Sequence, residues 1–308
     1  MANPESPALV DPYVFLLGRP PIGELLGFIR NMARDGADAD QAALAAEWRL
    51  ANDRVAALER DEAGIADHPP IRPLPPAMEP VARTVREDPM YRRAYGLVPT
   101  EIGLVELDRL VVFQKFINLG FVEEMRRTVP GAPDEKAVAR LALGIDRKAP
   151  DVRTAQHGSS VYSFLSPSND IRFLESTTVP PDRISGLTST GRPVSFIILG
   201  IGFGSNYLNA LHVEDRLVLN NGSHRAYLLR QLGVTHAPCV IQHVSRREEL
   251  DLVGSGDFKH NPDRYLKAAR PPLLGDYFDD RLRKVFPVPR KNRLVRVQIT
   301  VEQSDVPA

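Results

Sequence analysis

The chain has 308 residues, enough for either one large domain or two smaller ones. Its 39 Lys and Arg residues balance its 39 Asp and Glu residues, so no overall positive charge favours binding to nucleic acids or anionic membranes. The single cysteine, Cys239, excludes an intrachain disulfide framework and a zinc site built on several thiolates.

The sequence also lacks the usual signals for export or membrane insertion. The first ten residues have no basic start followed by an apolar core, and no stretch reaches the roughly 20 apolar residues that span a bilayer. We therefore expect a cytoplasmic protein without a membrane partner.

Two helices are predicted in residues 1–66, which we expect to form a helical N-terminal extension. The first is Ile22–Ala33 and the second is Asp40–Ala63, where apolar residues recur every three or four positions. Such a stripe usually packs inside its own chain, but it also suits a protein partner or a homo-oligomer.

A proline-rich run, His68–Pro76, cannot continue a helix, because proline lacks the amide donor and favours an extended backbone. We expect a linker over residues 67–82. It is predicted to act as a strap across the surface, although such runs can also bind an aromatic groove of a partner.

Residues 83–245 are predicted to hold the core. A strand is expected at Gly103–Val112 and a helix at Gln114–Met125. An insertion at about 130–185 is expected to contain a short helix, Glu135–Leu143, and short strands near Val161 and Ile171.

Further strands and helices are expected in the second half of the chain. The apolar run Pro193–Leu199 predicts a buried strand, and Gly200–Asn206 predicts a flexible loop. Over residues 246–308 we expect helices, one of them through Tyr277 and Leu282, and then a half-exposed strand at Leu294–Val301.

The segment Arg216–Gly233 predicts a strand, a tight turn and a helix. Gly222 permits a backbone conformation that other residues resist, Ser223 is suited to capping the helix, and Gly233 is suited to ending it. The free amides of the first helical turn and the positive end of the helix dipole favour a bound anion.

Two side chains of the turn strengthen this prediction. Arg225 offers a planar, charged fork for phosphate oxygens, and His224 offers a second donor, or an acid or base. The alternative is an ordinary helix start whose polar side chains satisfy backbone donors. The predicted phosphate site consists of the whole turn: Asn221, Gly222, Ser223, His224 and Arg225.

This order of elements resembles the ParB/sulfiredoxin superfamily. In that family a strand leads into a Gly-x-x-Arg turn, a helix ending in Leu-Gly and a strand introduced by Pro, and all of these occur between Arg216 and His243. The strand Val105–Leu110 and the helix after Gln114 are similar to its opening unit, and Pro193–Leu199 is similar to its middle strand. The resemblance implies an α+β fold with a ParB/sulfiredoxin-like mixed sheet, helices and a large insertion.

Several residues of the turn differ from the motifs of known members of the family, and these differences argue against some of the family's functions. Sulfiredoxins carry their reactive cysteine where Ser223 stands, which argues against thiol redox repair. Partition proteins usually have Glu-Arg-Arg at positions 223–225 and add a helix-turn-helix domain that we do not find, which argues against chromosome partitioning. The free-serine kinases have a His-His-Arg turn and a catalytic glutamate near the position of Gln114. Because glutamine cannot act as a general base, either the chemistry differs or Glu123 or Glu124 supplies the carboxylate.

The resemblance implies that the turn binds the phosphates of a nucleotide (ATP, ADP or CTP) or another phosphate. The function we expect from such a site is nucleotide- or phosphate-dependent chemistry on a small molecule, by phosphoryl transfer or nucleotide hydrolysis. His224 and Arg225 are then the catalytic candidates. A non-catalytic nucleotide-binding or protein-interaction module is the alternative, and a DNA-associated role is disfavoured by the balanced charge. No protein metal site is predicted, but Mg²⁺ carried with a nucleotide could use Glu214 or Asp215.

Overall fold

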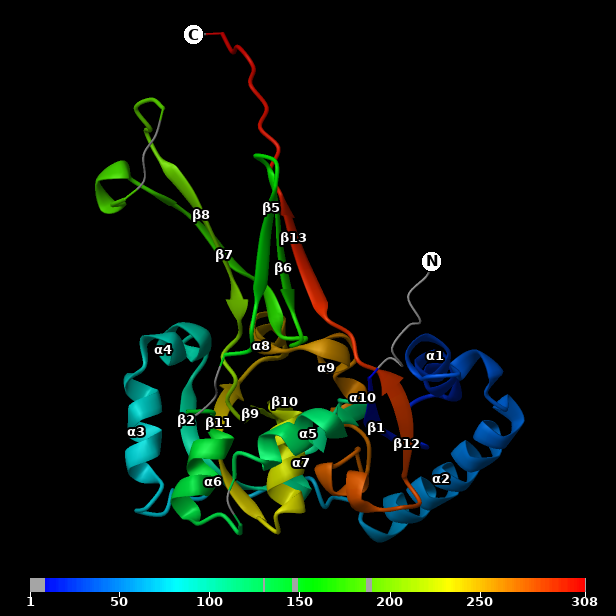
Figure 1. The fold of residues 1–308 in the computed structure, drawn as a ribbon. Coiled ribbons are helices and arrows are strands. Elements are labelled where there is room, and N and C mark those ends of the chain that lie inside the picture. Colours follow the sequence, from blue (N-terminus) through cyan, green and yellow to red (C-terminus); the bar gives the residue numbers. More distant parts are fainter. Residues whose placement is uncertain (1–8, 130, 146–148, 187–189, 308) are drawn as a thin grey trace. The chain divides into compact units, whose positions relative to one another are not determined.

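The computed structural model describes residues 9–129, 131–145, 149–186 and 190–307. The protein is mixed α+β and divides into two compact units (Figure 1). The first unit consists of Met1–Asp146 and Asn206–Arg290, and the second consists of Arg147–Ser205 and Lys291–Ala308.

A mixed sheet forms the centre of the first unit, with the strand order β2-β11-β9-β10-β3. Strand β11 is parallel to β9 and antiparallel to β2, whereas β10 is antiparallel to β9 and parallel to β3. Within the described residues the strands are β2 (Thr100–Glu106), β3 (Val111–Val112), β9 (Asn209–Val213), β10 (Arg216–Asn221) and β11 (His236–Val244).

The inner strands of this sheet are covered on both faces. Leu211, Val218 and Val240 are fully buried, as expected for strands that read as continuous apolar runs. The predicted strands at Leu217–Leu219 and Ala237–Ile241 are confirmed by β10 and β11. The predicted strand Gly103–Val112 is only partly right, because the short 3₁₀ helix η2 (Leu107–Arg109) interrupts it between β2 and β3.

Helices of the first unit pack against this sheet and share its main hydrophobic core. They are α3 (Glu79–Glu87), α4 (Pro89–Tyr95), α5 (Leu119–Arg126), α6 (Glu135–Ala142) and α7 (Ser223–Gln231). The sequence predicted α6 and α7 but missed α3 and α4. Each of these begins with a proline in its first turn, Pro80 or Pro89, where no amide donor is needed.

A second sheet of the first unit has the order β12-β1-β4 and was not predicted. Its strands are β1 (Val10–Leu16), β4 (Phe116–Asn118) and β12 (Arg283–Pro289). The N-terminal segment is therefore not purely helical. Strand β4 occupies the start of the expected helix Gln114–Met125, whose helical part is α5.

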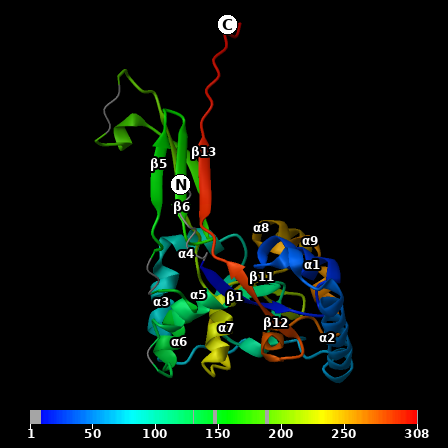
Figure 2. The same cartoon turned by 45° about the vertical axis from the view of Figure 1, so that its right-hand side comes forward.

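The two predicted N-terminal helices are confirmed as α1 (Ile22–Met32) and α2 (Gln41–Asp61), with the short 3₁₀ helix η1 (Gly36–Asp38) between them. They lie beside β1 and β12 (Figures 1 and 2). Leu44, Val55 and Leu58 of α2 are buried with Phe15 of β1. The apolar stripe of α2 thus packs inside its own chain.

The proline-rich run lies along β2 as a strap, as predicted. Arg72 and Leu104 exchange two backbone hydrogen bonds, of 2.9 and 2.8 Å between nitrogen and oxygen. The backbone N–H of His68 also donates to the carbonyl oxygen of Asp215, at 2.7 Å.

The chain between β11 and β12 forms short helices around a third hydrophobic cluster that includes Phe258 and Tyr265. The helices are η4 (Arg247–Glu249), α8 (Leu250–Val253), α9 (Gly256–His260), α10 (Asp263–Leu266) and η5 (Leu274–Phe278). The predicted helix through Tyr277 and Leu282 is wrong beyond Phe278, because Leu282 immediately precedes β12.

The second unit contains two small antiparallel sheets. The first joins β13 (Arg293–Gln298), β6 (Val161–Ser166) and β5 (Arg153–His157), and the second joins β7 (Ile171–Val179) and β8 (Phe196–Phe203). A 3₁₀ helix, η3 (Pro181–Arg183), lies between β7 and β8 in sequence. The C-terminal strand predicted at Leu294–Val301 is confirmed as β13.

The apolar run Pro193–Leu199 does form a strand, but it is neither buried nor part of the central sheet. Ile197 and Ile198 of β8 are 75% and 44% exposed, and β8 pairs with β7. The predicted loop at Gly200–Asn206 is also partly wrong, because β8 continues through Phe203. In the central sheet, β9 lies between β11 and β10.

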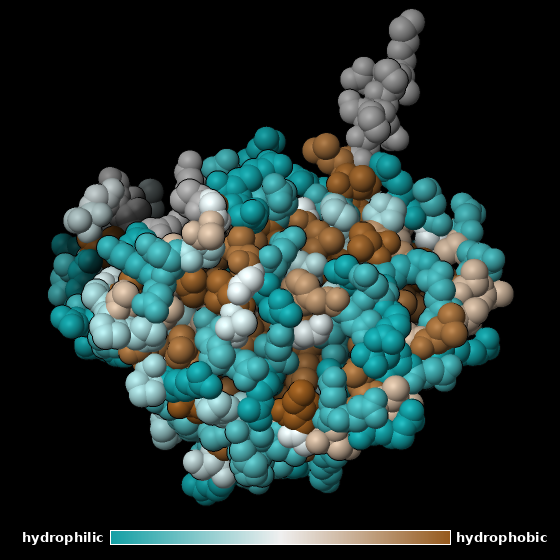
Figure 3. All heavy atoms as spheres, turned by 90° about the horizontal axis from the view of Figure 1, so that it is seen from below, coloured by the Kyte–Doolittle hydropathy of each residue, from teal (hydrophilic) through white to brown (hydrophobic). Residues whose placement is uncertain are grey.

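Hydrophilic side chains predominate on the face drawn in Figure 3, and apolar side chains form smaller spots between them. None of the helices in the described part of the chain is long and apolar enough to cross a membrane.

Candidate site at the Gly222 turn

The turn between β10 and α7 requires glycine. Gly222 precedes the first residue of α7 and has a left-handed backbone, with φ of 88°. A β-carbon at this position would lie 3.0 Å from the Cα of Leu208 and 3.2 Å from the carbonyl oxygen of Tyr207. Both the backbone conformation and the lack of space therefore disfavour larger residues.

Ser223 is the first residue of α7, and the structure corrects its predicted capping role. Gly222 occupies the capping position, and no side chain caps the helix. The amides of the first turn of a helix have no intrahelical partner and carry the positive end of the dipole. The Ser223 end of α7 therefore retains the electrostatic character that suits an anion.

Buried amide side chains fix the end of β10 that leads into the turn. Asn220 donates from Nδ2 to Oδ1 of Asn209 at 3.1 Å, and Asn209 donates to Oε1 of Gln242 at 3.2 Å. Ser255 donates to Oδ1 of Asn220 at 2.7 Å. In the turn itself, Oδ1 of Asn221 accepts from the backbone N–H of Gly222 at 2.8 Å. The predicted Asn221 thus helps to shape the turn.

His224 is held as a neutral imidazole. Its Nε2 atom accepts a hydrogen bond from the backbone N–H of Asn118 at 3.0 Å, and its ring lies edge-on to Phe121, with 5.3 Å between ring centroids. Burial, and then the neighbouring charge of Arg225, lower the pKa of His224 to about 4. Since Nε2 is an acceptor, the ring proton is on Nδ1.

Arg225 is buried, with 5% of its surface exposed, and its guanidinium forms a hydrogen bond within the protein. Its Nη1 donates to Oδ1 of Asn206 at 2.5 Å. Its guanidinium also lies close to Gly144, where a β-carbon would come within 3.0 Å of Nη2. Arg225 therefore ties the start of α7 to the chain that precedes β9, and its role with phosphate stays a prediction.

A polar network that the sequence did not predict adjoins the turn through Asn118. The Asn118 side chain caps α5 by accepting from the N–H of Phe121 at 3.1 Å, and its Nδ2 donates to Asp11 at 3.3 Å and to Tyr13 at 3.1 Å. Arg290 donates twice to Oδ1 of Asp11, at 3.1 and 2.6 Å.

This network shifts the pKa of two of its members. Burial raises the pKa of Tyr13, and the hydrogen bond to Asp11 raises the pKa of Arg290. Arg290 belongs to a basic run, Arg290-Lys291-Asn292-Arg293, of the kind that can contact phosphate but usually faces water. Asp11 had no sequence signal, because its strand was not predicted.

The carboxylates proposed as a general base are engaged elsewhere. Glu123 lies 3.4 Å from Nε of Arg127, and Glu124 lies 3.6 Å from Nη1 of Arg290. Gln114 precedes β4, and its carbonyl oxygen accepts from the hydroxyl of Tyr277 at 2.6 Å. None of these contacts links the three side chains to His224.

The two residues suggested for Mg²⁺ form ion pairs. Glu214 lies 2.7 Å from Arg247, and Asp215 lies 3.4 Å from His68. In the residues that the structure describes, no three His, Cys, Asp or Glu side chains form a group that could hold a metal ion.

No family model, curated protein or solved structure matches the chain. We therefore infer the function from the residues around Gly222 and their geometry.

Proposed function

We propose that the first unit is a divergent ParB/sulfiredoxin-like domain and that the Gly222 turn binds the phosphates of a nucleotide. The observation that carries the proposal is the left-handed Gly222, which joins a buried strand to a helix whose first residues are Ser223 and His224. Free helical amides together with a positive dipole end form an anion site.

The order of elements supports this proposal. Strand β10, the Gly222 turn, helix α7 and strand β11 follow one another, and Pro238 lies near the start of β11. Strand β8 does not support it, because it pairs outside the central sheet. Strand β9, which lies between β10 and β11, is the better counterpart of the middle strand.

The state of His224 determines what this residue can contribute. A neutral ring with its proton on Nδ1 is a hydrogen-bond donor at neutral pH, and it stabilises negative charge on a phosphate without giving up a proton. Arg225 contributes a buried positive charge next to the same turn. The proposed ligands are ATP, ADP or CTP, with Mg²⁺ carried by the nucleotide.

Two functions follow from such a site, and different observations favour each. Phosphoryl transfer or nucleotide hydrolysis, with a small molecule or water as acceptor, is favoured by the donors of His224 and the α7 amides, because both can stabilise charge that develops on phosphate. A non-catalytic nucleotide-binding module is favoured by the ion pairs of Glu123 and Glu124, which leave neither carboxylate in contact with His224.

Calorimetric titration with ATP, ADP and CTP, with and without Mg²⁺, tests nucleotide binding. A phosphate-release assay on the same samples, with water as acceptor, tests hydrolysis. Binding with release supports the enzyme, and binding without release supports the module or a transferase that lacks its acceptor. If none of the three nucleotides binds to the wild-type protein, the proposal is wrong.

A further inference from the structure

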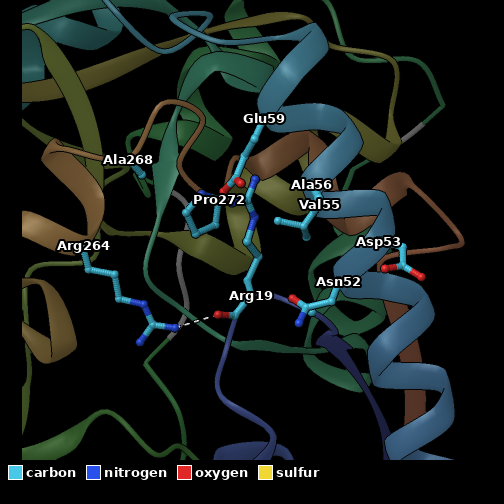
Figure 4. Close-up of a pocket in the computed structure, with 10 residues that line it drawn as sticks. Arg19, Asn52, Asp53, Val55, Ala56, Glu59, Arg264, Ala268 and Pro272 are labelled. Carbon is cyan, nitrogen blue, oxygen red and sulfur yellow. Dashed lines mark hydrogen bonds and ion pairs between the residues drawn. The ribbon is translucent and has the colours of Figure 1, made fainter.

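A pocket of about 510 Å³ lies between α2, the chain that follows β1, and α10 with the chain that follows it (Figure 4). Its lining includes Asn52 and Glu59 of α2, Arg19 after β1, and Arg264 and Pro272 from the later segments. This volume suits a small molecule. None of the five residues of the Gly222 turn lines the pocket.

The backbone around Arg19 is held in place from several sides. Arg264 donates from Nη2 to the carbonyl oxygen of Arg19 at 2.7 Å, and Trp48 donates to the carbonyl oxygen of Pro20 at 2.9 Å. Gly18 lies so close to α2 that a β-carbon on it would come within 2.7 Å of the Ala51 backbone. The position from which the Arg19 side chain extends is therefore well defined.

The Arg19 side chain is 8% exposed, and its hydrogen bonding is incomplete. It runs between Val55 and Pro272 towards Glu59 (Figure 4). Nη1 donates to Oε1 of Glu59 at 3.3 Å, whereas Nε and Nη2 are buried without a hydrogen-bond partner in the structure. Burial lowers the pKa of Arg19.

The neighbouring carboxylates do not accept hydrogen bonds from the two unpaired nitrogens of Arg19. The closest oxygen of Asp276 is 4.0 Å from Nε, and the same oxygen accepts from Arg270 at 2.5 Å and from the backbone N–H of Leu273 at 3.0 Å. The Glu59 side chain is 44% exposed and supplies the single contact at 3.3 Å. A buried cation with two unused donors is costly unless a further anion is bound.

We propose that this pocket binds a small molecule bearing a carboxylate or phosphate group, and that this group pairs with Arg19 in place of Glu59. The guanidinium presents planar pairs of donors that match the two oxygens of such a group. Glu59 competes with the ligand for Arg19, because its long and exposed side chain can swing away from the pocket. This site is separate from the Gly222 turn and does not depend on the function proposed there.

Thermal unfolding of the full chain with succinate or with inorganic phosphate, at ionic strength matched with sodium chloride, tests the proposal. At saturating probe we expect Tm to rise by roughly 5 °C in the wild-type protein. Arg19→Met keeps the length of the side chain but removes the charge. It should abolish the rise with succinate, and in combination with Ser223→Asp it should abolish the rise with phosphate. Glu59→Gln removes the competing anion and should lower the concentration of probe needed for half of the rise.

Two matched variants complete the experiment. Arg54→Met removes an arginine of α2 that pairs with Asp279 and does not line the pocket, so its response should equal that of the wild-type protein. Ser223→Asp alters the turn and should leave the response to succinate unchanged.

The two probes distinguish the ligand classes. These responses are compared in Ser223→Asp, in which the Gly222 turn is altered. A response to succinate alone assigns a carboxylate ligand, a response to phosphate alone assigns a phosphate ligand, and a response to both assigns a general oxyanion site. The proposal is overturned if neither probe shifts the Tm of Ser223→Asp, or if adding Arg19→Met leaves its response unchanged.

Discussion

The Nε2 atom of His224 accepts a hydrogen bond from the backbone N–H of Asn118, 106 positions away in sequence, at 3.0 Å. This contact joins the start of α7 to the start of α5, which Asn118 also caps. It fixes the ring and, because Nε2 is the acceptor, places the ring proton on Nδ1.

The first prediction concerns the pH dependence of stability. His224 has a pKa of about 4 in the folded protein, below its ordinary value of 6.5. The unfolded chain therefore binds the proton more readily between pH 6.5 and 4, so the contribution of His224 to stability is complete above pH 6.5 and decreases as the pH falls through this window. Between pH 7 and pH 5 the loss should be about 2 kcal/mol.

Urea unfolding of the wild-type protein and of His224→Gln at both pH values measures this contribution. Glutamine can accept the hydrogen bond from Asn118 but does not titrate. The free energy of unfolding of the variant should therefore lose about 2 kcal/mol less between pH 7 and pH 5 than that of the wild-type protein. Equal losses would mean that His224 titrates normally in the folded state.

The second prediction concerns Gly222. Gly222→Ala should reduce the free energy of unfolding by about 2–4 kcal/mol, because the added β-carbon meets both a left-handed backbone and the chain at Leu208. Gly233→Ala is the matched control, since Gly233 has a similar φ of 83° but open space around it. It should cost about 1–2 kcal/mol. Equal costs at the two positions would show that crowding at the turn is unimportant.

The third prediction concerns the network around Asn118. Asn118→Ala removes the cap of α5 and the hydrogen bonds to Asp11 and Tyr13, and it should cost about 2–4 kcal/mol of unfolding free energy. Asp134→Ala removes the exposed cap of α6, which accepts from Ala137 at 2.7 Å, and should cost about 1 kcal/mol. A cost for Asn118→Ala no greater than that of Asp134→Ala would show that the network adds nothing to the cap.

The fourth prediction concerns Cys239, which is fully buried in β11. Burial raises the pKa of its thiol well above the ordinary value, and the thiolate is the reactive form. Iodoacetamide should therefore alkylate Cys239 at neutral pH at least 100-fold more slowly in the native protein than in urea, as followed by mass spectrometry. Comparable rates would place the thiol in a reactive, accessible environment.

The sequence predicted the turn at Gly222 well because the signal there is local. A strand, a glycine and a helix follow one another within a few residues, and β10 and α7 appear where they were expected. The partners of the turn could not be predicted in this way. Asn118 and Asn206 reach His224 and Arg225 only through the tertiary fold.

The prediction of which strands form the central sheet was partly wrong, because it relied on apolar runs. Pro193–Leu199 has the composition of a buried strand, yet β8 is largely exposed and pairs with β7. The strand that does lie in the sheet, β9, contains Asn209, and a polar residue weakens the signal for a buried strand. Its side chain is accommodated because it donates to the carbonyl oxygen of Val240 at 3.0 Å and to Gln242.

The phosphate site at the Gly222 turn is tested most directly by calorimetric titration of ATP with Mg²⁺ into the wild-type protein, Ser223→Asp and Ser223→Asn. A negative charge at the first position of α7 favours the helix but repels phosphate, so Ser223→Asp should remain folded. We predict that its Kd for ATP rises at least 10-fold, while the Kd of the neutral Ser223→Asn stays within about threefold of the wild-type value. Equal affinities for all three proteins, or no binding to the wild-type protein, would contradict a phosphate site at this turn.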